Sequence, residues 1–171
     1  SLAQTAEGSL DEYTNILQRM RTLAVQSSNG SNTTADRAAL NAEVTELTDE
    51  LDRIATDSSF GGVSLLDGSY AVGFQVGADA GQVISMTISQ NFSSTVIGAD
   101  VTVSTFANAQ TAITNLDSVL STVNSTRADL GAKQNRFSSV IRSNTNTAEN
   151  VSASRSRIED TDYAAESAKL A

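Results

Sequence analysis

A regular repeat of apolar residues through the second half of the chain constrains the fold more than any other feature. Its members recur at steps of three and four, which places them along one face of an α-helix. The chain contains no proline, so no residue in this stretch forces such a helix to end. Repeats of this length are typical of coiled-coil-like packing and predict one long helix over residues 104–160. The apolar positions are Phe106, Ala109, Ile113, Leu116, Leu120, Val123, Leu130, Phe137, Ile141, Ala148, Val151 and Ile158.

Polar residues interrupt this repeat at Arg127, Gln134, Asn144 and Arg155, and Gly131 weakens the helix between them. Two interpretations stay open. The later half of the helix contains a packing defect, or it faces a partner subunit. The second is physically reasonable because polar residues at seam positions often fix the register between helices at some loss of stability.

Two shorter amphipathic helices are predicted in the first part of the chain, over residues 1–27 and 34–57. A run of turn-forming residues at 27–32 separates them. Thr33 and Asp36 have the spacing of a capping box at the start of the second helix. The apolar faces of the two helices consist of Leu10, Tyr13, Leu17, Met20 and Ala24, and of Leu40, Val44, Leu47, Leu51 and Ile54.

Between these helices and the long one, over residues 60–100, the period changes from three-four to two. Alternation by two is the signature of half-buried strands. The glycine-flanked stretch 77–81 lies between the two alternating runs, which predicts an antiparallel β-hairpin. The alternating positions are Tyr70, Val72, Phe74 and Val76, followed by Ile84, Met86 and Ile88.

The expected fold class is therefore mainly α. We expect an elongated rod of two N-terminal helices and one long C-terminal helix in coiled-coil-like packing, with a small antiparallel β-hairpin between them. Residues 1–171 are expected to form a single domain.

Composition excludes several functions. The net charge of −9 and a pI near 4.3 argue against nucleic acid or an anionic membrane as partner. The chain has neither histidine nor cysteine, the commonest general base and the commonest metal ligands. The acidic residues Asp49, Glu50, Asp52 and Asp57 follow a solvated helix face and lack the pattern of a calcium loop. We therefore expect no enzyme activity, no cofactor and no metal site.

Six segments, in the same order, resemble the bacterial flagellin family, and together they span nearly the whole chain. Within residues 17–26, the chain departs from the family pattern LQRxRELAVQ at Thr22, where glutamate is frequent. The segments are 1–8 (SLAQTAEG), 17–26 (LQRMRTLAVQ), 60–66 (FGGVSLL), 74–77 (FQVG), 127–137 (RADLGAKQNRF) and 154–164 (SRSRIEDTDYA).

The resemblance implies the helical core domain of a filament subunit, secreted and located in the extracellular flagellar filament. In that family, segments at both termini drive polymerisation. Because they would lie beyond Ser1 and Ala171, we expect this chain alone to be monomeric. The implied partners are other flagellin subunits, an export chaperone for the full-length chain and a vertebrate Toll-like receptor that recognises flagellin.

The receptor-binding positions that the family motif implies are Gln18, Arg19, Leu23 and Glu43. Arg19 and Leu23 lie four residues apart and share a helical face. The alternative is that Leu23 packs in the core while Arg19 and Glu43 are ordinary surface charges. For the whole protein, the alternatives are a hook–filament junction protein, which shares this helical core, and a generic helical adaptor module.

Overall fold

The computed structural model describes the backbone of residues 1–170 and their side chains, except those of Thr161, Asp162, Tyr163 and Leu170. The side chains of residues 161–163, near the end of the 154–164 segment, and the expected domain end at Ala171 lie outside the described part of the chain. The chain divides into two compact units. Unit 1 comprises Ser1–Gly73 and Ser85–Lys133, and unit 2 comprises Phe74–Ile84 and the chain from Gln134 onward.

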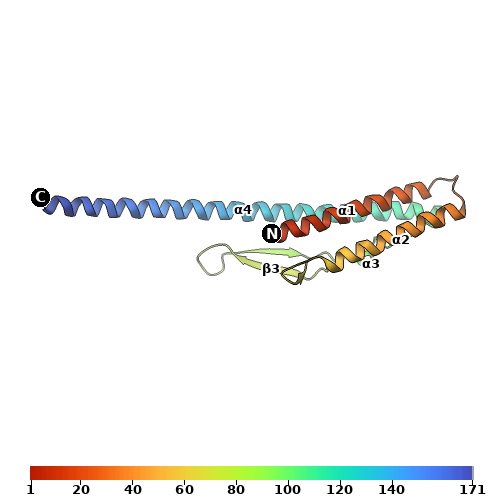
Figure 1. Cartoon of the computed structure of the whole chain (residues 1–171), viewed down its shortest axis with the longest axis horizontal. Coiled ribbons are helices and arrows are strands. Elements are labelled where there is room, and N and C mark those ends of the chain that lie inside the picture. Colours follow the sequence, from red (N-terminus) through yellow and green to blue (C-terminus); the bar gives the residue numbers. More distant parts are fainter. Residues whose placement is uncertain (171) are drawn as a thin grey trace. The chain divides into compact units, whose positions relative to one another are not determined.

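The structure confirms the mainly helical fold with two N-terminal helices, a long C-terminal helix and small strand pairs between them. Figure 1 shows α1 in red joined through a short connection to α2 in orange and yellow. The elements in chain order are α1 (Leu2–Ser27), α2 (Thr34–Asp57), β1 (Ser59–Phe60), β2 (Val63–Ser64), β3 (Tyr70–Gln75), β4 (Val83–Ile88), α3 (Ser94–Ile97) and α4 (Phe106–Leu170).

Both N-terminal helices begin at a capping box. At α2 the backbone N–H of Asp36 donates to Thr33 Oγ1 at 3.1 Å, and the Thr33 N–H donates to Asp36 Oδ2 at 2.8 Å. Two N–H groups that have no partner within the helix are thereby satisfied. Ser1 and Gln4 form the equivalent box at α1. The capping box that the sequence predicted at Thr33 is confirmed.

The core of unit 1 lies between α1, α2 and the first part of α4, and the buried stripe of α4 differs from the predicted seam. Phe106 is exposed, and Ile113 and Leu120 are only half-buried. Ala112 and Val119 are buried in the core instead. At these two places the residue before the predicted one, Ile113 or Leu120, faces the core. The apolar surface of α4 is two residues wide there, and sequence spacing alone does not choose between neighbours. The buried α4 residues are Ala109, Ala112, Leu116, Val119, Val123 and Leu130.

Two strand pairs, rather than one hairpin, follow α2. In β1–β2 the partners are Ser59 with Ser64 and Phe60 with Val63, in antiparallel register. The two turn residues, Gly61 and Gly62, have φ of 60° and 80°. Two-residue hairpin turns favour this left-handed backbone because its twist matches that of the strands, and glycine adopts it without a steric penalty.

The second pair, β3–β4, is the predicted hairpin, and its two strands are buried to different extents. Ile84, Met86 and Ile88 of β4 are buried while the residues between them are exposed, as alternation predicted. In β3 only Tyr70 is buried. The alternation through Val72 and Phe74 therefore does not mark a buried face of β3, which corrects that part of the sequence interpretation.

Unit 2 combines the end of the hairpin with the later part of α4. The rings of Phe74 and Phe137 meet edge to face with centroids 5.6 Å apart. The Asn144 side-chain amide donates to the Val76 carbonyl. Every side chain from residue 141 to residue 160 is exposed, including Ile141, which the predicted seam contains. In the described residues, none of the predicted seam positions between residues 141 and 160 is buried.

Candidate functional site

The surface formed by α1 and α2 brings together two of the four predicted receptor-binding residues. Arg19 Nε and NH2 both donate to Glu43 Oε1, at 2.9 and 2.7 Å. The two side chains are 52% and 43% exposed. Because α1 and α2 pack side by side, residues 24 positions apart in sequence form one ion pair on an open surface.

The other two predicted residues have different environments. Gln18 is exposed next to Arg19, and its backbone carbonyl accepts a hydrogen bond from Thr22 Oγ1 at 3.0 Å. Leu23 is only 1% exposed and packs into the core of unit 1. We refer to Gln18, Arg19, Thr22 and Glu43 as the α1–α2 surface, and Leu23 lies beneath it.

A second ion-pair cluster lies further along α2. Arg53 Nε donates to Glu50 at 2.9 Å, and Arg53 NH1 lies 3.6 Å from Asp57 Oδ2. Hydrogen bonding to the Arg53 guanidinium holds the pKa of Glu50 below its usual value. These pairs lie within one helix and are exposed, so each contributes little to stability. Two of the acidic residues predicted on the solvated face of α2, Glu50 and Asp57, are thus paired with an arginine of the same helix.

Two arginine contacts that sequence analysis did not predict join α1 to α4. Arg21 Nε and NH2 donate to the two carboxylate oxygens of Asp117, at 2.6 and 3.3 Å. This hydrogen bonding lowers the pKa of Asp117 and raises that of Arg21. Arg127 Nε donates to Glu7 Oε1 at 2.8 Å and lies at one of the polar interruptions of the α4 repeat. The polar interruption at Arg127 therefore pairs with acidic residues of α1.

Buried and half-buried polar contacts attach the segment between the hairpin and α4 to the helices. Tyr13 OH donates to the Phe92 carbonyl at 2.8 Å, and Ser27 Oγ donates to the Val103 carbonyl at 2.6 Å. Burial, followed by the charge of Asp52, raises the pKa of Tyr13. Nothing local in the sequence signals these contacts, because each joins residues more than 70 positions apart.

Asp52, which was expected on the solvated face of its helix, is half-buried. Its two carboxylate oxygens instead accept hydrogen bonds from the backbone N–H of Ser94 at 2.7 Å and from Ser94 Oγ at 2.9 Å. Asp52 thus holds the short helix α3 against α2.

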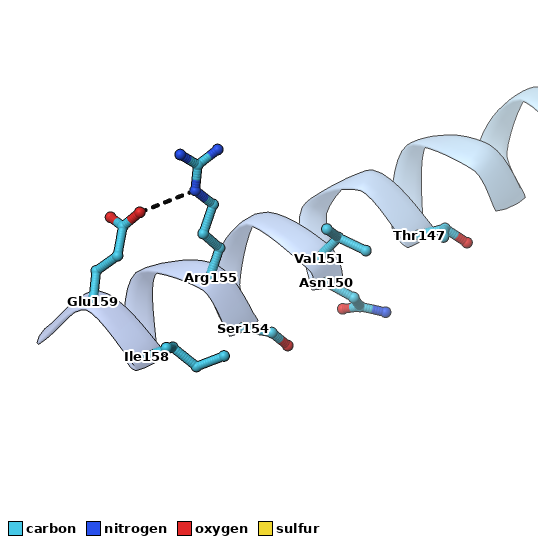
Figure 2. Close-up of a pocket in the computed structure, with 7 residues that line it drawn as sticks. All are labelled: Thr147, Asn150, Val151, Ser154, Arg155, Ile158 and Glu159. Carbon is cyan, nitrogen blue, oxygen red and sulfur yellow. Dashed lines mark hydrogen bonds and ion pairs between the residues drawn. The ribbon is translucent and has the colours of Figure 1, made fainter. Parts of the chain in front are cut away.

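The later part of α4 carries a polar and apolar surface that belongs to a single helix. Figure 2 shows its side chains projecting from successive turns of α4, with an ion pair between Arg155 and Glu159. Because one helix supplies all of them, they form an open face and not an enclosed cavity. The residues shown are Thr147, Asn150, Val151, Ser154, Arg155, Ile158 and Glu159.

Within the described residues, no group of three or more acidic side chains is placed to hold a metal ion. Over the same part of the chain, no helix combines the length and the apolar character needed to cross a membrane.

Comparisons with known proteins agree over both halves of the chain. Residues 1–71 match the bacterial flagellin N-terminal helical region, and residues 113–171 match the bacterial flagellin C-terminal helical region. The chain is 34% identical to flagellin B of Vibrio cholerae over 275 aligned positions, which cover 99% of this chain and 73% of the relative. It is 45% identical to a flagellin of Halalkalibacterium halodurans, with 97% of this chain and 62% of the relative covered.

A solved structure gives the same result for the fold. The crystal structure of Bacillus cereus flagellin superimposes with a TM-score of 0.76 at 32% identity, covering 84% of each chain.

Proposed function

This chain belongs to the bacterial flagellin family and is a structural subunit of the extracellular flagellar filament, and we propose that its α1–α2 surface is also recognised by a flagellin-binding Toll-like receptor. The family is non-enzymatic, and membership of it implies polymerisation with other flagellin subunits in the filament. The relatives reported above are themselves flagellins, which favours a filament subunit over a junction protein or a generic adaptor.

The observation that carries the receptor proposal is the exposed Arg19–Glu43 pair. Both groups are accessible, and each has spare hydrogen-bonding capacity, because NH1 of Arg19 and Oε2 of Glu43 take no part in the pair. A partner that supplies an acidic or amide group could therefore bind the guanidinium without first breaking the pair. Arginine is among the residues that most often carry binding energy at protein interfaces.

Gln18 and Leu23 support this surface in different ways. Gln18 is exposed beside Arg19 and can hydrogen-bond a partner directly. Leu23 is buried, so we propose that it acts from beneath by fixing α1 against the core. Truncation of Leu23 would then affect binding through the packing of the helix and would also lower stability.

The test is binding of this chain to the ectodomain of a flagellin-recognising Toll-like receptor, measured for Arg19→Ala and Glu43→Ala beside the parent. We expect Arg19→Ala to weaken the affinity by about tenfold or more, since loss of an interface arginine can cost about 2 kcal/mol. Arg53→Ala is the matched control, because Arg53 is equally exposed and paired within α2 but lies off this surface. Equal binding by the parent and the helical Arg19→Ala protein would reject the proposal.

Two further expectations stay predictions. We propose that this protein binds an export chaperone, which a co-purification from cells that secrete it would test. We also propose that this chain alone is monomeric, which light scattering at increasing concentration would test. A mass that rises to a dimer would contradict the second.

A further inference from the structure

The connection between α1 and α2 contains the sequence Asn29-Gly30-Ser31, and its geometry points to a chemical modification. We propose that Asn29 is the site at which this protein deamidates spontaneously. Asn29 and Gly30 are both exposed. The site needs no enzyme, and water is its only co-reactant.

The reaction proceeds through a five-membered ring. The backbone nitrogen of Gly30 gives up its proton to water and attacks Cγ of Asn29. The new Cγ–N bond forms as the Cγ–Nδ2 bond breaks, and the side-chain nitrogen takes a proton from water and leaves as ammonia. Water then opens the succinimide, either at Cγ to give aspartate or at the main-chain carbonyl to give isoaspartate. No oxidation or reduction takes place, and either product carries one new negative charge.

Two features of the structure favour the first step. A Cβ on Gly30 would meet nothing within 4 Å apart from its two chain neighbours, so no other part of the described chain crowds this residue, and the described structure gives its N–H no hydrogen-bond partner. Ser31 donates to Asn29 Oδ1 twice, from its backbone N–H at 3.0 Å and from Oγ at 2.8 Å. Hydrogen bonds to this oxygen draw electron density from Cγ, which makes it a better target for the nitrogen.

The chain contains an internal comparison with the same local pattern. In Asp67-Gly68-Ser69, Asp67 Oδ1 accepts the same two bonds from Ser69, at 3.0 and 2.6 Å. Gly68, however, packs against Asn91, whose Cβ would lie 3.2 Å from an added Cβ, and Asp67 forms a β-bridge with Asn91. The Ser69 hydrogen bonds also lower the pKa of Asp67, and an ionised carboxylate is a poor target for a nucleophile. Ring closure is therefore disfavoured at Asp67 and open at Asn29.

The modification would alter the corner between α1 and α2. The Asn29 carbonyl accepts hydrogen bonds from the Asn32 backbone N–H at 3.2 Å and from Arg37 NH2 at 3.1 Å. In isoaspartate this carbonyl becomes a carboxylate, and the backbone continues through the former side chain. The new charge then lies where the Arg37 guanidinium already binds, which stabilises the product while the Asn32 turn is lengthened by one backbone atom.

The test is incubation of the purified chain at mildly alkaline pH, followed by peptide mapping with electron-transfer fragmentation, which separates isoaspartate from aspartate. We expect Asn29 to convert before any other asparagine, with release of ammonia and isoaspartate as the main product. We expect Asp67 to remain unmodified over the same period.

Gly30→Ala is the matched variant. Its side chain has open space and Gly30 lacks a left-handed φ, so alanine is tolerated there, while the added methyl group hinders ring closure. We expect conversion to slow severalfold, with an unchanged circular dichroism spectrum. The proposal is overturned if Asn29 keeps its amide while other asparagines convert, if Asp67 isomerises as fast, or if the folded Gly30→Ala protein converts at the parent rate.

Discussion

Tyr13 contributes both apolar packing and a hydrogen bond to the core of unit 1. Its side chain is fully buried, and its ring meets that of Phe92 edge to face at 5.4 Å. Its hydroxyl donates to the Phe92 carbonyl. Without this bond, two buried polar groups would have no partner, which is more unfavourable than the bond itself is favourable.

We expect Tyr13→Phe to lower the free energy of unfolding by about 1–3 kcal/mol, because the ring is kept while the Phe92 carbonyl loses its donor. Urea denaturation followed by circular dichroism measures this as a lower midpoint. Tyr70→Phe is the control. Tyr70 is also buried but has no hydrogen-bond partner in the described structure, so its change should stay within about 0.5 kcal/mol. Equal midpoints for both variants would show that the Tyr13 hydroxyl contributes nothing.

At the scale of single elements, the N-terminus of α2 links a predictable sequence motif to a dependence on pH. Asp36 accepts the Thr33 backbone N–H, and this hydrogen bond lowers the pKa of Asp36 in the folded protein. A group with a lowered pKa stabilises the fold above its unfolded pKa of about 4. That contribution is lost as the pH falls through the folded pKa.

We therefore expect Asp36→Asn to remove part of the acid dependence of stability. The parent should lose more thermal stability than the variant when the pH is lowered from about 5 to about 2. An asparagine at this position can still accept the Thr33 N–H through its amide oxygen but does not titrate, so the two proteins should differ mainly in how steeply stability falls with pH. Parallel melting curves across this range would contradict the role given to Asp36.

Arg127 shows how a polar residue can belong to a helix seam. Its side chain is only 29% exposed and reaches Glu7 on α1. We expect Arg127→Ala to lower the free energy of unfolding by about 1 kcal/mol, from lost packing of the arginine stem and from a partly screened ion pair. Arg155→Ala, which removes an 80% exposed arginine paired within α4, should change it by less than about 0.5 kcal/mol. Equal losses in chemical denaturation would mean that the contact with α1 adds nothing.

The same elements show which features a sequence can predict. The α2 capping box and the ends of the first two helices follow from local chemistry, so their residues were correctly identified. The buried stripe of α4 was placed one residue off at Ile113 and Leu120, because the side that packs against α1 is decided by the tertiary fold. The β1–β2 turn was not predicted, since two-residue strands are too short to show a period.

At the scale of the whole molecule, the candidate site was predictable only in part. The motif placed Arg19 and Glu43 on two separate helices, but their pairing depends on how α1 packs against α2. The contacts of Arg21 with Asp117 and of Arg127 with Glu7 join residues 96 and 120 positions apart. No local pattern encodes such partners, because exposed charges pair with whichever opposite charge the packing brings near.

The two units also predict uneven stability along α4 itself. From Ala109 to Leu130 the helix buries one face in the core of unit 1. From residue 141 to residue 160 every side chain is exposed, with Ile141, Val151 and Ile158 at 51–64%. Most helical stability in proteins comes from packing rather than from propensity, and segments with few buried contacts open at low free energy.

We therefore expect native-state hydrogen exchange of the isolated chain to divide α4 into two parts. Amides between residues 112 and 130 should exchange slowly, near the rate set by global unfolding, and amides between 141 and 160 should exchange by local opening, orders of magnitude faster. Leu116→Ala, which creates a cavity in the core, should accelerate the first part by lowering global stability and leave the second unchanged. Uniform protection along α4 would mean that residues 141–160 are packed in solution, and concentration-dependent protection there would show that a second copy covers them.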